Sequence, residues 1–407
     1  MLSTLIPLFD ETQTVTAYSL FTLKDNYLLN PMSIGTGVND GAGSIAGLEI
    51  LNNIGLATLS DDKEVFVEIN HISIYSNIAE QCKVPKNRVV LLLSTRIQPT
   101  DEIVSRLVEL KSQGFKLAMR KLNVSDFQAY TPILELLDYV LLNHSRIDIS
   151  KARVYFNNLF PNIQLCAVNV NTNEEFEQLK ETGGYKYYEG EFFRKPIVKA
   201  DTKVAPLKIN YIELLNVIND ADFDLTDAAD VISRDAGLVI SLLKIANKLT
   251  RNSEITSVKH ACAMIGQKEL KHWINTAVTA ELCADRPSEV VRIVMVRAKF
   301  AEGLAAELGL AMDAEELFLM GLFSMLDIML EKPLSEALDM VLVSNEIKKS
   351  LLTADGKYSF VMDIIKYYEN ADWSELSREM LLRSISDKQV SQKYLEAVTW
   401  YSEMFGE

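Results

Sequence analysis

The sequence predicts an α/β domain followed by an all-α domain. The first half alternates short apolar runs, rich in β-branched residues, with amphipathic stretches, a pattern typical of strand and helix units around a mainly parallel sheet. In the second half, apolar residues recur at three- and four-residue spacing, as in helical bundles. A chain of 407 residues is also too long for one ordinary hydrophobic core, which favours two domains.

Six strands are predicted in the first half, at residues 15–22, 64–69, 88–94, 115–120, 138–143 and 163–168. Helical segments lie between them. Segment 101–114 ends in Gly114, where a helix C-terminus is expected. Segment 171–184 has acids in its first turn and Gly183 and Gly184 at its end. Repeated units of this kind indicate a barrel or a wound sheet.

The pattern changes at residues 195–210, a charged stretch with prolines and no periodicity, which we interpret as a linker. We therefore expect one domain at residues 1–198 and a second at 199–407. The clearest helical segments of the second domain are 224–249, 288–309 and 314–332.

The formal net charge of −15 disfavours nucleic acid or an anionic membrane as the main partner. Residues 1–200 carry 19 basic and 23 acidic side chains, and residues 201–407 carry 22 and 33. Since both halves are acidic and no long basic tract compensates, we expect protein partners.

The chain is expected to be cytoplasmic. Its start, MLSTLIPLFDETQ, lacks the basic flank of a secretory signal. The most apolar stretch, residues 317–330, is shorter than the ~20 residues of a membrane helix and contains Asp327. The four cysteines form no CxxC pair, so no redox or zinc site is expected from them.

Four fragments of the second half resemble the HDOD domain in order and spacing: SRDAGLVISLLKIANK with Asp235, ITSVKHACAMIGQKELKHW, FLMGLFSMLDIMLEKPLSEAL and YYENADW. HDOD domains are similar to HD-type metal phosphohydrolases but lack the metal ligands. This half has no His-Asp dipeptide and only two histidines, His260 and His272. We expect both to be structural, with no dinuclear metal site.

The first half resembles an EAL domain over residues 10–198. The segment YKYYEGEFFRKPIV is similar to the closing segment of that family, with Glu189 in place of Gln and with Gly190, Lys195 and Pro196 retained. Residues 88–122 and 136–148 also fit. The resemblance implies a TIM-like (β/α) barrel of EAL type.

EAL phosphodiesterases use two divalent cations, which need several carboxylate oxygens at the carboxyl ends of barrel strands. The resemblance places Ser19 at the acid of the Glu-Ala-Leu motif, and Arg120 and Lys121 at a pair of Asp residues. It places Glu68 or Asn70 at an Asn ligand. The remaining family positions fall on Leu92, Thr95, Leu141, Asn143 and residues 168–171. A hydroxyl cannot replace the first acid, and two cations repel Mg²⁺. We therefore expect no catalytic residue, no metal and no cofactor.

The resemblance implies a non-catalytic bacterial signalling protein in a pathway linked to cyclic di-GMP, such as motility, biofilm or surface behaviour. Expected partners are a sensor kinase, a response regulator or a cyclic di-GMP enzyme, and homodimerisation is open. The alternatives are a metal-independent cyclic di-GMP receptor, a residual phosphodiesterase and an HD-type phosphohydrolase. We do not expect the nucleotide to bind, because Arg120 and Lys121 should face solvent or pair with Glu135, Asp138 or another local acid.

Overall fold

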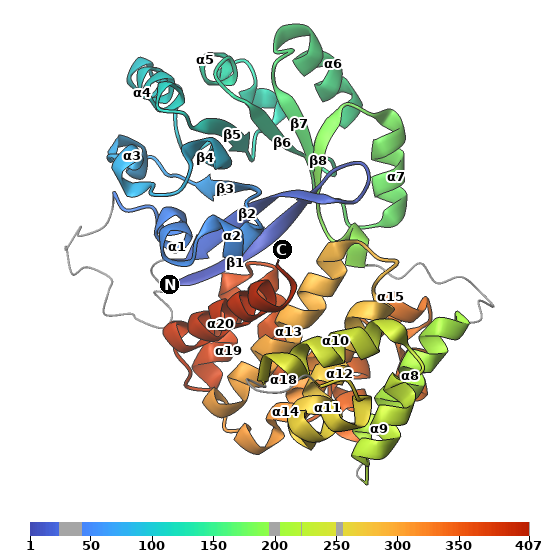
Figure 1. The fold of residues 1–407 in the computed structure, drawn as a ribbon. Helices are drawn as coiled ribbons and strands as arrows, with labels where there is room; N and C mark the ends of the chain where they lie inside the picture. The colour runs from blue at the N-terminus through green and yellow to red at the C-terminus, as the bar shows by residue number, and fades with distance from the viewer. Residues whose placement is uncertain (24–42, 195–203, 221, 250–254, 407) are drawn as a thin grey trace. The chain divides into compact units, whose positions relative to one another are not determined.

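The computed structural model describes residues 1–23, 43–194, 204–220, 222–249 and 255–406. Eight strands form a closed barrel in the order of the chain (Figure 1). The strands are β1 (Leu2–Phe9), β2 (Val15–Leu23), β3 (Glu64–Glu68), β4 (Val89–Ser94), β5 (Lys116–Arg120), β6 (Tyr139–Asn143), β7 (Gln164–Val168) and β8 (Tyr185–Glu189). The barrel implied by the EAL resemblance is thus confirmed, and the wound sheet is excluded.

Each of the six predicted strands lies within one residue of its expected bounds, but β1 and β8 were not predicted. The first strand contains Pro7, and a proline argues against a strand with neighbours on both sides. The barrel accommodates it because β1 pairs along its whole length only with β2, in antiparallel orientation. Its pairing with β8 is restricted to Phe9 and Tyr188. The pairs from β2 to β8 are all parallel.

Helices and short 3-10 turns connect the barrel strands. They are α1 (Ala46–Ile54), α2 (Leu56–Ser60), η2 (Ser73–Tyr75), α3 (Ile78–Gln81), η3 (Lys86–Arg88), α4 (Asp101–Ser112), η4 (Val124–Asp126), α5 (Thr131–Leu134), α6 (Ile149–Leu159), α7 (Asn173–Thr182) and η5 (Phe192–Arg194). The two predicted helices correspond to α4 and α7. Glycines follow both, with Gly114 at φ 96° and Gly183 at φ 69°, backbone conformations that few other residues adopt.

Among the described residues from 204 onward, all regular secondary structure is helical, as predicted. The helices are α8 (Pro206–Asn219), α9 (Leu225–Ile232), α10 (Ala236–Leu249), α11 (Val258–Ile265), α12 (Gln267–Leu282), α13 (Ser288–Glu307), α14 (Ala314–Phe323), α15 (Leu326–Leu330), α16 (Leu334–Met340), α17 (Asn345–Leu352), α18 (Ser359–Glu369), α19 (Trp373–Leu382) and α20 (Asp387–Phe405), with η6 at Ala311–Asp313. Among the residues described, none of these helices is long and apolar enough to cross a membrane.

Two segments expected to be single helices are each divided in two. In 224–249, the side chain of Asp235 accepts a hydrogen bond from the backbone N of Leu238 at 2.9 Å and so begins α10. In 314–332, the break falls at Ser324, whose hydroxyl donates to the carbonyl of Gly321 at 2.7 Å. The expected linker overlaps a helix, because α8 begins at Pro206, a residue well suited to a first helical turn. Lys195 and Pro196 lie outside the described residues.

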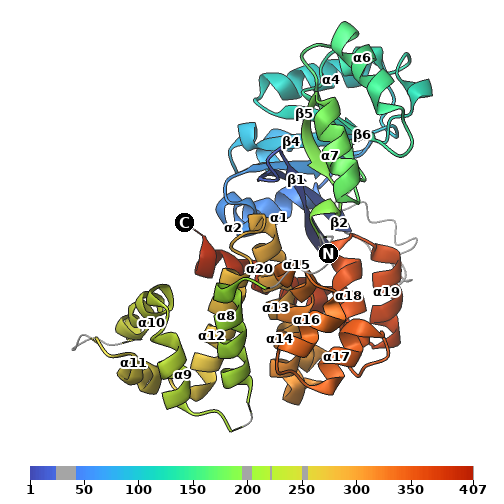
Figure 2. The ribbon, with the colours of Figure 1, turned by 90° about the vertical axis from the view of Figure 1, so that its right-hand side faces the viewer.

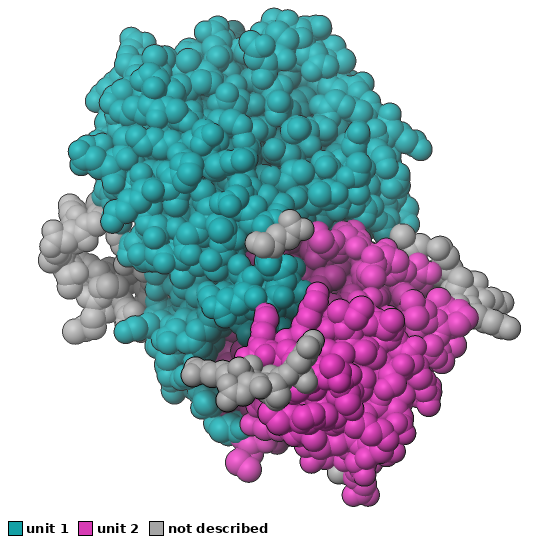
Figure 3. Space-filling model, in the orientation of Figure 1, with its two compact units in different colours: residues 1–195, 306–311, 363–407 teal, residues 196–305, 312–362 magenta. Residues whose placement is uncertain are grey.

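The chain divides into two compact units (Figure 3). Unit 1 comprises residues 1–195, 306–311 and 363–407, and unit 2 comprises residues 196–305 and 312–362. The barrel therefore shares its unit with the C-terminal segment of the chain.

Contacts at β1 explain why the C-terminal helices belong to unit 1. Because β8 leaves most of the outer edge of β1 unpaired, the backbone N–H of Ser3 donates to the Tyr368 hydroxyl at 3.3 Å instead. Thr4 donates to the Tyr394 hydroxyl at 3.4 Å, and α20 packs against β1 and α2. The C-terminal helices thus complete the edge that the barrel leaves open.

In unit 2 the helices form two groups (Figure 2). The first consists of α8 to α12, with α12 against α8 and α11 against α9, α10 and α12. The second contains α14 to α17, with α17 against α14 and α16. The two groups meet where α12 contacts α14.

Candidate functional site at the barrel mouth

The interior of the barrel holds one apolar cluster with polar side chains beyond it. The cluster consists of Leu8, Ala17, Phe66, Val90, Leu92, Ala118, Tyr139, Leu141, Cys166, Val168 and Tyr187. Because side chains alternate between the two faces of a strand, a residue two positions further on points into the same interior. Six polar residues meet this condition, and all but Ser19 are the last residues of their strands. We call them the barrel mouth: Ser19, Glu68, Ser94, Arg120, Asn143 and Glu189. Catalytic groups of (β/α) barrels lie at this end.

A buried ion pair between Arg120 and Glu189 occupies the barrel mouth. Nη2 of Arg120 lies 2.7 Å from Oε1 of Glu189, and the Ser19 hydroxyl donates to Oε2 at 3.1 Å. The exposed fractions of Arg120, Glu189 and Ser19 are 9%, 8% and 1%. The Arg120 guanidinium also lies over the ring of Phe21, 4.8 Å from its centre, in a cation–π contact. Both carboxylate oxygens of Glu189 are therefore engaged by the protein itself.

This pair differs from the expected environment of Arg120. We expected exposure to solvent or pairing with Glu135, Asp138 or another local acid, but the partner is Glu189, three strands further around the barrel. Asp138 instead binds Lys111 at 3.0 Å. A buried charge without a counterion costs several kcal/mol. Glu in place of the family's Gln at position 189 is thus the electrostatic complement of Arg at position 120.

Lys121 is in a different environment from Arg120. Strand β5 ends at Arg120, and Lys121 follows with φ 64°, in the left-handed region, and with its side chain exposed. Of these two adjacent cations, Arg120 alone is buried in the barrel mouth.

The other positions derived from the resemblance fall into two groups. Leu92 and Leu141 belong to the apolar cluster and are each 1% exposed. Asn143 and Thr95 are used in local turns. The Asn143 side-chain oxygen accepts hydrogen bonds from the backbone N and hydroxyl of Ser145 at 3.0 and 2.7 Å. The carbonyl of Thr95 accepts one from the side-chain amide of Gln98 at 3.1 Å within its turn, and another from the distant Tyr130 hydroxyl at 2.7 Å.

Glu68 and Asn70 have different roles in the structure. Glu68 is the last residue of β3 and follows Phe66 on the inward face, where its side chain is exposed. The side-chain oxygen of Asn70 accepts hydrogen bonds from the backbone N of Ile72 and of Ser73, both at 2.8 Å. Asn70 therefore stabilises the turn after β3, and Glu68 is the residue of the barrel mouth.

Gly190 fixes the position of Glu189. A Cβ atom at Gly190 would lie 1.8 Å from the carbonyl oxygen of Val170, and the backbone has φ 157°. Two hydrogen bonds hold this close approach, from Val170 N to Glu189 O at 3.0 Å and from Phe192 N to Val170 O at 3.2 Å. Steric exclusion of a side chain thus explains the glycine at position 190 of the closing segment.

A second acid–base pair lies at the opposite, amino end of the barrel interior. Lys116 binds the carboxylate of Glu64, and the Tyr139 hydroxyl donates to the same carboxylate at 2.9 Å. Burial raises the pKa of Tyr139, and it raises the pKa of Tyr187 to about 12. Both phenols therefore stay protonated, and the apolar cluster is bounded by an ion pair at each end.

Two of the four histidines, His144 and His272, have contacts that give them a structural role. The His144 Nδ1 lies 3.0 Å from the carbonyl of Val168, and Nε2 lies 3.6 Å from Glu175. The ring of His272 lies against that of Phe318, tilted by 33° with ring centres 4.1 Å apart, and His260 is exposed. Across the described ranges, no group of three or more His, Cys, Asp or Glu side chains is arranged to hold a metal ion.

Sequence reasoning missed Phe21, Ser94 and the partner of Arg120. The substitutions at positions 120 and 189 were both visible as departures from the EAL pattern. Their coupling was not visible, since it depends on barrel closure across 69 residues of chain.

Comparison with known proteins identifies the second half of the chain. Residues 205–354 match the family model of the HDOD domain. The C-terminal part of the chain therefore contains an HDOD domain, and it follows an eight-stranded barrel of the form expected for an EAL-like domain. The predicted resemblance to EAL/HDOD two-domain proteins is confirmed.

Two relatives align with most of the chain. One is the "Cyclic di-GMP phosphodiesterase CdgJ" of Vibrio cholerae, 23% identical over 340 residues, covering 82% of this chain and 78% of that protein. The other is "Uncharacterized protein YuxH" of Bacillus subtilis, 26% identical over 408 residues, covering 97% of this chain and 96% of that protein.

Solved EAL structures resemble part of this chain. The EAL enzyme Bd1971, bound to cAMP and cyclic di-GMP, has a TM-score of 0.37 and 16% identity, covering 47% of this chain and 61% of that one. BlrP1 of Klebsiella pneumoniae, in complex with calcium and cyclic di-GMP, has a TM-score of 0.36 and 15% identity, covering 46% and 54%. The chain thus spans less than two thirds of the length of either.

Proposed function

We propose that this protein acts without catalysis, through protein contacts, in a bacterial signalling pathway linked to cyclic di-GMP. The observation that carries the proposal is the buried Arg120–Glu189 pair with Ser19 bound to the same carboxylate. Two hard cations need several free carboxylate oxygens, and hydrolysis of a phosphodiester through them needs both cations. In the barrel mouth one carboxylate is already neutralised by Arg120, which leaves Glu68 as the other acid.

The link to cyclic di-GMP is supported by the name of the Vibrio cholerae relative, a cyclic di-GMP phosphodiesterase. At 23% identity, a signalling context can be shared while the active-site residues differ. The partners we propose are a sensor kinase, a response regulator or a cyclic di-GMP enzyme. The acidic surface, with a formal net charge of −15, favours protein over nucleic acid.

Turnover of cyclic di-GMP tests this proposal directly. The full chain is incubated with cyclic di-GMP and Mg²⁺ or Mn²⁺, and the linear dinucleotide is quantified by chromatography. The Vibrio cholerae relative serves as the positive control under the same conditions. We expect no product above the protein-free blank. Turnover that is lost in Glu68→Gln would show that the barrel mouth is catalytic.

The second candidate is a receptor that binds cyclic di-GMP without metal, and the name of the same relative favours it. Arg120 is the cation in the barrel mouth that a phosphate could bind. A phosphate ligand would have to displace Glu189 from the Arg120 guanidinium. Calorimetric titration of the full chain with cyclic di-GMP separates the two. Binding heat in the wild type that is absent in Arg120→Met supports the receptor. No binding heat at about 50 µM cyclic di-GMP excludes a receptor with a dissociation constant at or below that concentration.

A further inference from the structure

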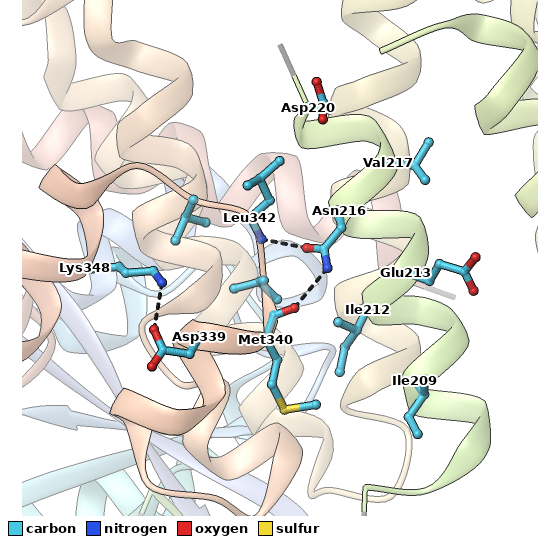
Figure 4. Close-up of a pocket in the computed structure, with 12 residues that line it drawn as sticks. Ile209, Ile212, Glu213, Asn216, Val217, Asp220, Asp339, Met340, Leu342 and Lys348 are labelled. Atoms are coloured by element: carbon cyan, nitrogen blue, oxygen red, sulfur yellow. Dashed lines mark hydrogen bonds and ion pairs between the residues drawn. The ribbon is translucent and has the colours of Figure 1, made fainter. Parts of the chain in front are cut away.

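Unit 2 contains a groove of about 790 Å³ between its two groups of helices. One wall is α8, and the other is the segment from Asp339 to Val343 with Lys348 (Figure 4). The side-chain amide of Asn216 joins the walls, since it donates to the carbonyl of Met340 at 3.0 Å and accepts from the backbone N of Leu342 at 2.6 Å. The two walls are therefore joined to each other by hydrogen bonds within the unit.

Helix α8 has two faces with separate tasks. Tyr211, Leu214, Leu215 and Ile218 are buried in the core of unit 2, and Ile212, which also lines the groove, is buried as well. The residues that line the groove recur at three- and four-residue spacing and form a second stripe: Ile209, Ile212, Glu213, Asn216, Val217 and Asp220. At 1.5 Å per residue this stripe is about 17 Å long, roughly three helical turns.

The groove is apolar along its length and acidic at its rim. Ile209 and Leu342 are 49% and 47% exposed, so apolar surface on both walls faces solvent. The lining includes three acids and a single amine, Lys348, which binds Asp339 at 2.8 Å. Between residues 209 and 233 the sequence has six acidic and no basic side chains. Asp220 also lies at the C-terminus of α8, where the helix dipole adds negative potential. A complementary surface is thus a helix with apolar and basic residues on one face.

Such a helix is present in the same unit. Helix α10 has a stripe formed by Ile240, Leu243, Lys244 and Lys248. Ile240 is 55% exposed, and both lysines are exposed. In the described part of the chain, neither lysine amine has a carboxylate partner.

We propose that the α10 stripe of one copy docks in the α8 groove of a second copy of this chain. Ile240 and Leu243 then contact the apolar walls, while Lys244 and Lys248 approach Glu213 and Asp220. The surface pair of Glu213 with Arg234, at 3.2 Å and about half exposed, is weak enough to exchange partners. Each chain has a net charge of −15, but repulsion between charges more than about 8 Å apart is largely screened at physiological salt. The lysine–carboxylate pairs in the contact are closer than this distance, so their attraction is screened less. This inference does not depend on whether the barrel is catalytic.

Charge reversal in two variants of the full chain tests the contact. Lys244→Glu/Lys248→Glu reverses the helix, and Glu213→Lys/Asp220→Lys reverses the groove. Each variant alone places like charges together, but their mixture restores opposite charges at both contacts. Asp227→Lys/Asp230→Lys on α9 makes the same charge change outside the groove and is the matched control.

Sedimentation velocity measures the outcome. We expect wild type and the control to associate at concentrations up to about 100 µM, each reversed variant to associate at least roughly tenfold more weakly, and the mixture to recover. A wild-type chain that stays monomeric at this concentration contradicts the proposal, whatever else binds the groove. So does association that neither reversal weakens, or a mixture that fails to recover.

Discussion

Arg120 and Glu189 are 69 positions apart in the sequence, yet the guanidinium Nη2 of one lies 2.7 Å from the carboxylate Oε1 of the other. The pair joins β5 to β8 inside the barrel, with both side chains about nine-tenths buried. Each residue departs from the EAL pattern, and each supplies the counterion that the other needs in this buried position. Together with the Ser19 hydroxyl, Arg120 occupies both carboxylate oxygens of Glu189.

Removing one member of this pair should destabilise the barrel. Glu189→Gln leaves the buried Arg120 without a counterion, and we expect the free energy of unfolding to fall by about 3 kcal/mol. Urea unfolding followed by circular dichroism measures it. Arg378→Gln, which removes an exposed pair with Glu375, should change it by less than about 0.5 kcal/mol.

The double variant Arg120→Met/Glu189→Leu should be more stable than the sum of its single changes indicates. Apolar side chains of similar size can replace a buried ion pair at little cost, whereas either single change leaves a lone charge. Additive effects in this cycle would show that the two charges are not coupled.

Gly190→Ala should disrupt the connection between β7 and β8. The new Cβ would overlap the carbonyl oxygen of Val170, at 1.8 Å, so the backbone must move and Glu189 must move with it. We expect a loss of more than about 3 kcal/mol in unfolding free energy, as for other severe steric changes. Gly55→Ala is the control, because Gly55 has φ 90° but open space around it, and it should cost only about 1–2 kcal/mol. Equal losses of unfolding free energy in Gly190→Ala and Gly55→Ala would refute the steric explanation for Gly190.

Deleting residues 384–407 should loosen β1. The deletion removes α20, which packs against β1 and α2. We expect backbone amides of β1 to exchange roughly a hundredfold faster, equivalent to about 3 kcal/mol, because apolar surface of β1 and α2 becomes exposed. Deleting only residues 402–407 keeps every buried residue of α20 and should leave this exchange unchanged. If neither deletion accelerates amide exchange in β1, the C-terminal helices do not belong to the stable core of unit 1.

The stability of the chain should depend on pH through His272. Burial holds the pKa of this imidazole below its usual 6.5. As the pH falls through 6.5, the unfolded chain therefore binds a proton that the folded chain does not, and unfolding becomes easier. We expect wild type to lose more unfolding free energy between pH 7.5 and 5.5 than His272→Gln does. The exposed His260 gives the control, and His260→Gln should retain the wild-type difference.

Local sequence patterns predicted much of the fold, because strands and helices leave periodic signatures. The six expected strands, the glycines after α4 and α7 and the helical second half all depend on residues close in the chain. Strand β1 was missed since Pro7 argues against a paired strand, and its outer edge is completed by Tyr368, 365 positions away. No local pattern reports such a contact.

In the candidate site too, the sequence indicated which residues matter but not the distant contacts between them. The resemblance located Ser19, Arg120 and Glu189, and the structure brings these three together. It could not indicate that Arg120 is buried while Lys121 is exposed, because that depends on strand β5 ending between them. The partner of Arg120 was expected nearby in sequence, but closure of the barrel supplied a distant one.

In the function proposed for this protein, the barrel mouth binds no pair of divalent cations. The most direct test is to crystallise the full chain, soak the crystals in MnCl₂ and map the manganese by anomalous diffraction. The claim predicts no anomalous peak within about 2.5 Å of the carboxylate oxygens of Glu68 or Glu189, and an intact bond from Arg120 to Glu189. Two manganese peaks bound by these carboxylates, with Arg120 displaced, would contradict it.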